Sequence, residues 1–209
     1  METGRYGTLA ASILERPAFL GEIRVIAVDG GTGAGKSTVA GALADAFRGL
    51  GKSVHVLHTD DLLDGWSDLD GSGRRLDELV LTPLAEGRPA AYPAYDWDAS
   101  RFGDRLQHVG APDVLILEGV GSARKANRSR LTFTVFVEAP LALRRERVLA
   151  RDGAQVAAPL RRWIAEETAH FTAEGTRASA DVVMDGRARV GHDHETEYVR
   201  LDPPPGQGA

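Results

Sequence analysis

The sequence predicts an α/β fold, with a five-stranded, mostly parallel sheet, helices on both of its faces and a short helical lid. Two observations predict this class. Runs of β-branched residues alternate with helical patterns along most of the chain, and glycine-rich or acidic turns follow several of the runs. The composition suits a packed fold, since 43% of the 209 residues are hydrophobic and 26% are charged. We therefore expect a single domain over residues 1–209.

Short apolar runs predict the strands, because a buried parallel strand is apolar on both faces. In chain order these runs are 23–28, 53–57, 114–117, 131–137 and 180–184. Apolar residues that recur every three or four positions predict the helices. The helices are expected over 8–16, 36–48, 76–86, the arginine-rich segment after Pro140, and 160–174. Pro17, Gly49 and Gly87 follow three of these helices and mark their ends.

Three further segments complete the predicted organisation. Residues 64–73 are rich in Gly, Ser and Asp, which predicts a loop. The lid is expected over about residues 144–162. The polar tail over 191–209 ends in a Pro- and Gly-rich stretch, so we expect it to be flexible, with 197–201 as a candidate edge strand.

Charge and cysteine content exclude several functions. The chain has no cysteine, which excludes a disulfide scaffold, a cysteine nucleophile and a thiolate metal site. Its net charge of −5 argues against a nucleic-acid partner. No stretch approaches the ~20 apolar residues of a membrane span, and residues 1–19 lack the apolar core of a signal peptide. We expect a cytoplasmic protein that contacts neither membrane nor nucleic acid.

The glycine-rich turn after the first strand matches a phosphate-binding motif. Residues 30–37 read Gly-Gly-Thr-Gly-Ala-Gly-Lys-Ser and satisfy G-x-x-x-x-G-K-[ST], with a strand pattern before them and a helix pattern after them. Glycines let backbone N–H groups surround a phosphate, and the start of the helix adds its positive end. These features predict the P-loop NTPase fold. The expected nucleotide-binding residues are Gly30, Gly31, Thr32, Gly33, Ala34, Gly35, Lys36, Ser37 and Thr38.

Acidic residues follow two of the later strands, at the sheet edge that carries this motif. Asp60 and Asp61 come after 53–57, and we expect Asp60 to accept the proton of a substrate hydroxyl as it attacks the γ-phosphate. Glu118 ends 114–117, where an acid can order Mg²⁺. An acidic cap on the following turn is the alternative for either aspartate.

Side chains from three segments are expected to share the bound nucleotide and its metal ion. Lys36 is expected to span the β- and γ-phosphates. The expected magnesium residues are Ser37, Asp60 and Glu118.

Three arginines of the predicted lid share one helical face. Arg144, Arg147 and Arg151 are spaced i, i+3 and i+7. Such a stripe suits a lid that brings cations to a transferring phosphoryl group, and a solvated basic face is the alternative. The expected catalytic residues are therefore Asp60, Lys36, Arg147 and Arg151.

A further acid, Glu167, falls on the otherwise apolar face of the helix over 160–174. A buried carboxylate needs a partner, which could be a group of the lid or of the substrate. The alternative is a rim position where the side chain reaches water.

Other classes of P-loop protein fit less well. A GTPase needs N-K-x-D to read guanine, and the sequence has none; the larger ATPase machines need signature motifs that this chain lacks. These observations favour a small-molecule kinase.

Several segments together resemble the uridine kinase-like P-loop kinases. The resemblance covers roughly residues 23–186 and is carried by VDGGTGAGKST, HTDDLL, YPAYDWDASR, VLILEGV and RRERVLARD. It implies ATP and Mg²⁺ as cofactors, Asp60 as the catalytic base, and Glu118 as the acid that closes the third strand. It also implies nucleoside contacts at Tyr95 and Asp96, and lid arginines within 144–151.

The departures from that pattern fall on the acceptor pocket. The Tyr-Asp block continues in the family into a histidine, which is absent here, and the aromatic pair after the catalytic acid is replaced by Leu62-Leu63. Tyr92, Tyr95, Trp97 and Trp66 offer aromatic faces to a planar base, although core packing explains each equally well. The expected acceptor-binding residues are Asp61, Tyr95, Asp96, Trp97, Arg101 and Arg144.

The sequence thus predicts an ATP- and Mg²⁺-dependent phosphotransferase that moves the γ-phosphate to a hydroxyl group of a small molecule, with a nucleoside as the favoured acceptor. A pantothenate-like, sugar or nucleoside monophosphate acceptor is the first alternative. A catalytically silent nucleotide-binding module is the second. GTP as donor and a homo-oligomeric state remain open.

Overall fold

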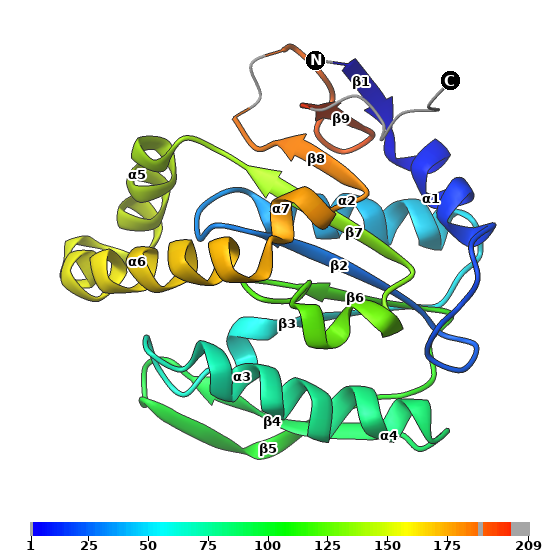
Figure 1. Cartoon of the computed structure of the whole chain (residues 1–209), viewed down its shortest axis with the longest axis horizontal. Helices are drawn as coiled ribbons and strands as arrows, with labels where there is room; N and C mark the ends of the chain where they lie inside the picture. Colours follow the sequence, from blue (N-terminus) through cyan, green and yellow to red (C-terminus); the bar gives the residue numbers. More distant parts are fainter. Residues whose placement is uncertain (1, 188–189, 202–209) are drawn as a thin grey trace.

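The computed structural model describes residues 2–187 and 190–201. A seven-stranded sheet runs through its centre in the order β1-β9-β8-β7-β2-β6-β3 (Figure 1). Strands β2, β3, β6, β7 and β8 are parallel, while β9 and β1 extend the sheet antiparallel beyond β8. The strands of this sheet are β1 Glu2–Arg5, β2 Arg24–Gly30, β3 Val54–His58, β6 Val114–Glu118, β7 Phe133–Glu138, β8 Val182–Asp185 and β9 Glu197–Arg200.

Helices flank the sheet, and a separate two-stranded hairpin lies at its β3 end. The hairpin strands are β4 Ala90–Asp96 and β5 Arg101–Val109. The helices are α1 Tyr6–Leu14, α2 Lys36–Gly49, α3 Leu69–Leu76, α4 Thr82–Ala85, α5 Leu141–Asp152, α6 Ala157–Glu174 and α7 Thr176–Ser179. Short 3₁₀ helices occupy Thr59–Leu62, Lys125–Arg130 and Ala154–Val156, and Asp77–Leu81 is a π-helical turn.

Alternating side chains of the central strands form two cores. Ile26 and Val28 of β2 pack with α1 and α2 on one face, whereas Val25 and Ala27 pack under α3 and the hairpin on the other. All four are fully buried. Because both faces are covered, the parallel strands read as continuous apolar runs in the sequence.

The predicted α/β class is confirmed, and the five predicted strands are present and parallel to one another. The predicted number of strands in the sheet is wrong, because β9 and β1 add two more. The candidate strand at 197–201 is present as β9, but β1 lies outside it. The four residues of β1 are too polar and too few to signal a strand. Gly4 fits there because the ring of Tyr198 occupies the space of a Cβ.

Two other expectations need correction. Residues 64–73 are not all loop, since α3 begins at Leu69 and continues through Asp77–Leu81 into α4. Gly71 and Gly73 make this segment look like a loop in the sequence. In the structure the side chains of Asp68 and Arg124 pack where their Cβ atoms would lie. The tail expected to be flexible contains β9, while its last part, 202–209, lies outside the described residues.

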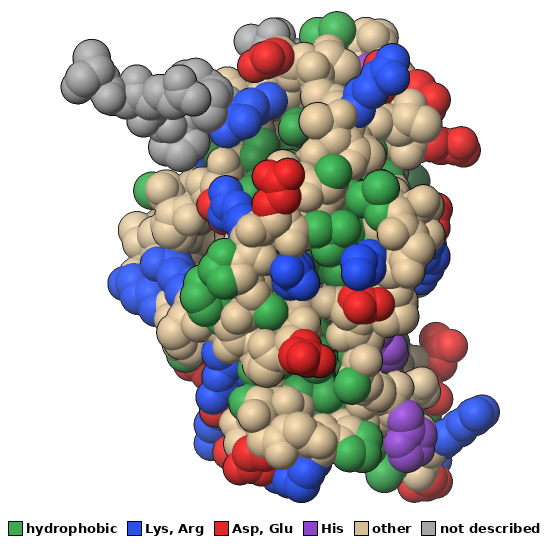
Figure 2. Space-filling view, turned by 90° about the vertical axis from the view of Figure 1, so that its right-hand side faces the viewer, with side chains coloured by type: hydrophobic (Ala, Val, Ile, Leu, Met, Phe, Trp, Pro, Cys, Tyr) green, Lys and Arg blue, Asp and Glu red, His purple; other side chains and the backbone are tan. Residues whose placement is uncertain are grey.

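The surface opposite the loop-bearing edge of the sheet mixes charges. In Figure 2, acidic and basic side chains are interspersed and apolar groups are small. Among the helices of residues 2–187 and 190–201, none is long and apolar enough to cross a membrane.

Candidate active site

The predicted phosphate loop links β2 to α2 at the carboxyl edge of the sheet. Its conformation requires glycine, since Gly33 and Gly35 have φ of +79° and +102°. Lys36 begins α2 and is only 8% exposed, and its Nζ donates a hydrogen bond to the Gly31 carbonyl at 3.4 Å. The ammonium group therefore reaches back across the loop. The nine expected nucleotide-binding residues run from the last residue of β2 through this loop into the first turn of α2. Backbone N–H groups and the helix N-terminus favour an anion there.

Glu118 and Ser37 meet beside the loop. Glu118 lies opposite His58 in the β3–β6 pairing, and the His58 Nδ1 and Glu118 Oε2 atoms are 2.6 Å apart. The hydrogen bond with Glu118 raises the pKa of His58. Burial alone would raise the pKa of Glu118, but hydrogen bonds with His58 and Ser37 and the charge of Lys36 bring it below its ordinary value. Glu118 is therefore a buried, ionised carboxylate next to the Ser37 hydroxyl group.

Asp60 lies on the turn after β3, within the electrostatic reach of Lys36, Glu118 and Arg151. Burial raises its pKa, and Lys36 opposes that rise. A carboxyl group with a raised pKa is a better proton acceptor than an ordinary one. Asp61 turns instead toward the hairpin, where it accepts a hydrogen bond from Tyr92. The structure thus separates the two aspartates that the sequence places side by side.

These residues suit Mg²⁺ held together with nucleotide phosphates. Ser37, Asp60 and Glu118 supply one hydroxyl and two carboxylates, and Mg²⁺ commonly takes one or two carboxylates plus phosphates and water. Within residues 2–187 and 190–201, no three His or acidic side chains are grouped as a complete metal centre. An ion at this place would therefore need the phosphates as ligands.

Asp29 is an acid that sequence reasoning missed. It is completely buried, and its two carboxylate oxygens accept hydrogen bonds from the backbone N–H groups of Gly30, Gly121 and Ala123 at 2.8, 3.1 and 3.0 Å. It thereby ties the loop after β6 to the start of the phosphate loop. A lone acid at the end of an apolar strand was the available signal. Burial raises the pKa of Asp29 to about 6, against the opposing effect of these hydrogen bonds.

Replacing Asp29 with asparagine is expected to change how stability depends on pH. Because the folded-state pKa lies above the unfolded value, the folded protein holds the proton more tightly. That contribution to the free energy of unfolding is complete below about pH 4 and is lost as the pH rises to about 6. Wild type should therefore lose about 3 kcal/mol relative to Asp29→Asn over this range, as measured by urea unfolding. Asp45→Asn, exposed on α2, controls for the loss of one carboxylate. A constant difference between wild type and Asp29→Asn would contradict the expectation.

The three lid arginines lie along α5 but reach different places. Arg144 Nη1 donates to the carbonyl of Thr32, and Arg147 Nη1 donates to that of Gly33, both at 3.3 Å. Arg151 forms two hydrogen bonds with Asp152, at 2.6 and 2.8 Å. This bond raises the pKa of Arg151, and Asp60 and Glu118 add to the effect. The first two arginines thus contact the phosphate loop, and the third lies nearer the proposed base.

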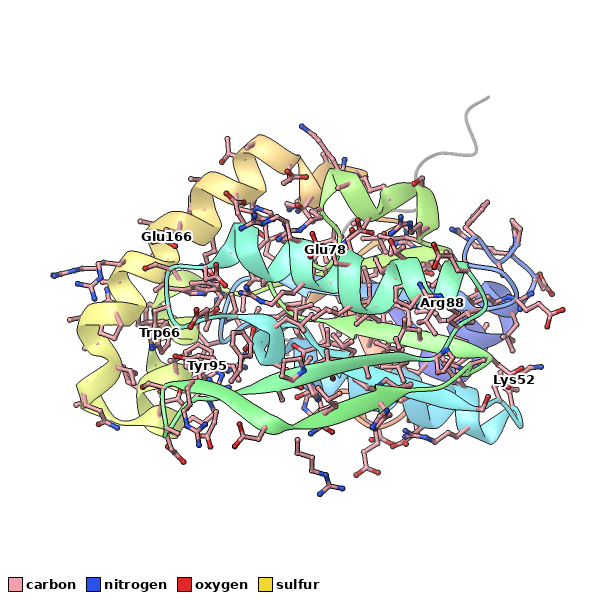
Figure 3. The ribbon with its side chains drawn as sticks, turned by 90° about the horizontal axis from the view of Figure 1, so that it is seen from below. Lys52, Trp66, Glu78, Arg88, Tyr95 and Glu166 are labelled. Atoms are coloured by element: carbon pink, nitrogen blue, oxygen red, sulfur yellow. The ribbon has the colours of Figure 1, made fainter. Side chains whose placement is uncertain are left out.

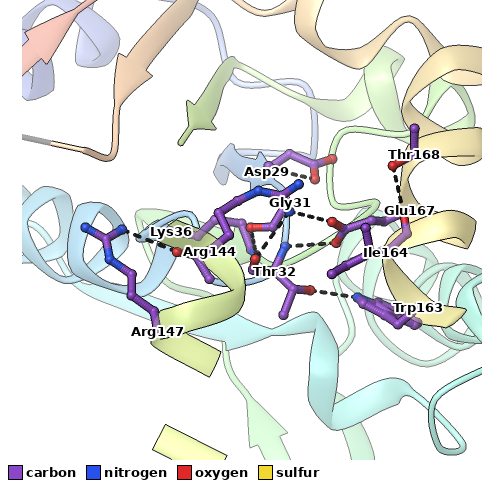
Figure 4. Close-up of polar contacts among 12 residues, drawn as sticks. Asp29, Gly31, Thr32, Lys36, Arg144, Arg147, Trp163, Ile164, Glu167 and Thr168 are labelled. Carbon is purple, nitrogen blue, oxygen red and sulfur yellow. Dashed lines mark hydrogen bonds and ion pairs between the residues drawn. The ribbon is translucent and has the colours of Figure 1, made fainter. Parts of the chain in front are cut away.

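Glu167 is buried, and its partners are a lid residue and the phosphate loop. One carboxylate oxygen lies 2.5 Å from Arg144 Nη1, and the other accepts the backbone N–H of Thr32 at 2.8 Å (Figure 4). The Thr32 hydroxyl oxygen in turn accepts the Nε1–H of Trp163 at 2.6 Å. The rim position is therefore wrong for Glu167.

A cavity of about 580 Å³ opens beside the phosphate loop. It is lined by Thr32, Asp60, Leu63, Trp66, Trp97, Asp98, Arg151, Asp152, Gln155, Val156 and Trp163. All three tryptophans of the chain are among these residues. Trp66 and Tyr95 lie near each other at the end of the molecule where α6 is found (Figure 3). The base candidate Asp60 and the phosphate loop therefore border one space large enough for a small molecule.

Several expected acceptor-binding residues have other contacts. Asp96 accepts the backbone N–H groups of Asp98 and Ala99 and so shapes the turn of the hairpin. Arg101 pairs with Asp104 at 3.7 Å on the surface. Tyr95 packs edge-on against Trp97 behind the cavity wall. Of the expected set, the structure brings Trp97 to the wall itself.

The sheet topology and the glycine-rich loop are those of the P-loop kinase fold. No protein-family model matches the chain. A uridine kinase of Limosilactobacillus reuteri is 30% identical over 109 residues, which cover 46% of this chain and 49% of the relative. A uridine kinase of Lactiplantibacillus plantarum is 27% identical over 198 residues, or 84% of this chain and 94% of the relative. The chain thus spans about half the length of the first of these relatives.

A solved structure has a fold similar to that of this chain. The structure of a possible uridine kinase from Bacillus stearothermophilus superimposes with a TM-score of 0.62 at 22% identity, covering 85% of this chain and 96% of that one. In sequence the chain is similar to these uridine kinases, and its fold is similar to that of the solved structure.

Proposed function

We propose that the protein is an ATP- and Mg²⁺-dependent phosphotransferase that moves the γ-phosphate to a hydroxyl group of a small molecule, with a nucleoside as the favoured acceptor. One observation carries the proposal. Asp60, a carboxylate within reach of the Lys36 charge, lines the same cavity as Thr32 of the phosphate loop. An acceptor in that cavity would therefore lie between a base and the phosphate that it attacks.

The residues divide the chemistry among them. Lys36 and the amides of the phosphate loop hold the phosphates, and Ser37, Asp60 and Glu118 would hold Mg²⁺. That ion would neutralise charge on the phosphate oxygens when bound. The acceptor oxygen forms a bond to the γ-phosphorus as the bond to ADP breaks, and its proton passes to the Asp60 carboxylate. Arg151 and Arg147 offset negative charge on the phosphoryl group.

The charge of the cavity bears on the choice of acceptor. Asp60, Asp98 and Asp152 line it against one arginine, Arg151, which is already paired with Asp152. An anionic acceptor such as pantothenate or a nucleoside monophosphate would meet an excess of negative charge. The tryptophans offer apolar contact to an uncharged ring. This balance favours a neutral nucleoside over the anionic alternatives.

The arrangement of the tryptophans favours a second candidate, a small hydroxylated organic cation. The Trp66 ring stands at 70° to Trp97 and 80° to Trp163, with centroids 5.5 and 6.3 Å away. Rings at such angles surround a rounded ligand better than they stack on a flat one. Carboxylates beside aromatic rings also suit a cation.

A panel of acceptors tests the proposal. ADP release is measured with ATP and Mg²⁺ in the presence of nucleosides, nucleoside monophosphates, pantothenate, sugars and hydroxylated amines. We expect acceptor-dependent release with a nucleoside and none with the anionic compounds. Release with the amines alone would establish the second candidate. Tight ATP binding without release for any acceptor would overturn the proposal in favour of a silent nucleotide-binding module.

Replacing Trp97 with alanine should raise the KM of the acceptor about 5- to 150-fold, since an aromatic contact is worth about 1–3 kcal/mol. The KM of ATP should stay within about twofold, because Trp97 is not part of the phosphate loop. Leu106→Ala is the control: Leu106 lies on the same hairpin and is 46% exposed, against 40% for Trp97. Equal effects of the two variants on acceptor KM would contradict a role for Trp97.

A further inference from the structure

Glu167 is an unexpected residue in a site that receives a polyanion. Its side chain is 1% exposed, and one of its oxygens lies 2.8 Å from the backbone nitrogen of Thr32 in the phosphate loop. A free negative charge there would repel the phosphates of the nucleotide. A buried carboxylate at this place therefore needs a counter-ion.

Arg144 neutralises Glu167. The two side chains are 2.5 Å apart at their closest atoms and only 14% and 1% exposed. The pair joins the first turns of α5 to the middle of α6, 23 residues further along the chain. Because its charge is matched, Arg144 brings little net positive charge to a bound phosphate.

Arg144 of this pair also packs closely against the backbone of the phosphate loop. The Arg144 guanidinium group lies where a Cβ on Gly31 would be, and the Arg144 backbone lies against Gly33 in the same way. Arg144 Nη1 further donates to the Thr32 carbonyl at 3.3 Å. Thr32 is thus held at its N–H by Glu167, at its C=O by Arg144 and at its hydroxyl by Trp163.

We propose that Glu167 is a positioning residue for the phosphate loop. It fixes the Thr32 amide and orients Arg144, so that the loop already has its phosphate-receiving shape before nucleotide arrives. Arg144 acts as a structural cation, and Arg147 and Arg151 remain to contact the phosphoryl group. The inference rests on the proposed nucleotide site but not on the identity of the acceptor.

Glu167→Gln tests the role of the carboxylate, with binding of ATP and ADP followed by calorimetry on the whole protein. Loss of the charge leaves buried Arg144 without a counter-ion, and nucleotide Kd should rise about 10- to 100-fold. At saturating ATP the acceptor KM should change by less than about threefold. Glu166→Gln is the matched control, because Glu166 is the neighbouring residue on α6, only partly buried, and has the same charge. It should bind nucleotide as wild type does.

The double variant Arg144→Gln with Glu167→Gln separates positioning from direct phosphate binding. Two neutral amides can pair in the place of the ion pair, so nucleotide affinity should recover at least tenfold relative to Glu167→Gln. If Arg144 were instead a phosphate-binding cation, removal of its charge would weaken binding further, and that result would overturn the proposal.

Thermal unfolding and a second variant separate the remaining explanations. A purely structural role predicts a lower Tm for Glu167→Gln with an unchanged nucleotide Kd, which would also overturn the proposal. If Glu167→Gln does not fold, Trp163→Phe removes the hydrogen bond to Thr32 while keeping an aromatic ring at the position. It should raise nucleotide Kd by about three- to tenfold, and no change would count against the proposal. Wild type that fails to bind ATP would refute the proposed function itself.

Discussion

Lys36→Met is expected to lower phosphotransfer about 1,000-fold and to weaken ATP binding. The ammonium group is buried and lies across the phosphate loop, 3.4 Å from the Gly31 carbonyl. Methionine fills the same space without charge, so the loss reports electrostatic stabilisation of the phosphates. Removal of one well-placed donor or cation from such a site typically costs 100- to 100,000-fold in rate. The measurements are acceptor-dependent ADP release and calorimetric ATP binding.

Lys52→Met is the matched control for this variant. Lysine is scarce in the chain, with Lys52 and Lys125 as the other two, and Figure 3 places Lys52 at the end of the molecule away from Trp66 and Tyr95. Lys52 is half-exposed and pairs with Asp113 at 3.8 Å, a surface contact of little energetic consequence. Its activity should stay within twofold of wild type. Turnover by Lys36→Met at the level of Lys52→Met would refute the proposed phosphate site.

Asp60→Asn is expected to lower kcat about 100- to 10,000-fold, the usual range for loss of a general base. Binding of ATP measured without Mg²⁺ should be kept or become tighter, because the variant removes a negative charge next to the phosphates. Burial raises the pKa of Asp60, so wild-type kcat should rise with pH as this carboxyl loses its proton and then level off. The variant should lose that part of the pH profile.

Asp64→Asn is the control for Asp60→Asn. Asp64 is exposed on the same segment, where its backbone N–H bonds to Asp68, and kcat should be unchanged on its replacement. The role assigned to Asp60 fails if Asp60→Asn keeps full turnover together with ATP binding.

The residues that the sequence located correctly are those whose position depends on local structure. The phosphate loop follows from one continuous motif, and Glu118 follows from the end of a strand whose apolar run is plain. In a parallel sheet, the carboxyl ends of strands meet at one edge, so Asp60 could be placed near Lys36 without tertiary information.

The residues that the sequence did not place depend on distant partners. Glu167 was marked as unusual, but its pairing with Arg144 depends on how α5 and α6 meet. Helix α3 was not predicted because its glycines suggest a turn, whereas in the structure they pack against the side chains of Asp68 and Arg124. The short strand β1 gains its pairing from β9, which lies at the opposite end of the sequence. Local sequence patterns cannot predict contacts between residues so far apart in the chain.

The cavity has an optical consequence. Trp66, Trp97 and Trp163 are the only tryptophans in the sequence, and all three line the space beside Asp60. Intrinsic fluorescence excited near 295 nm therefore has no tryptophan background from the rest of the molecule. The unlabelled protein therefore reports on this site directly, since quenching or a spectral shift would follow ligand binding in the cavity. A fluorescence titration could then measure occupancy of the cavity separately from turnover.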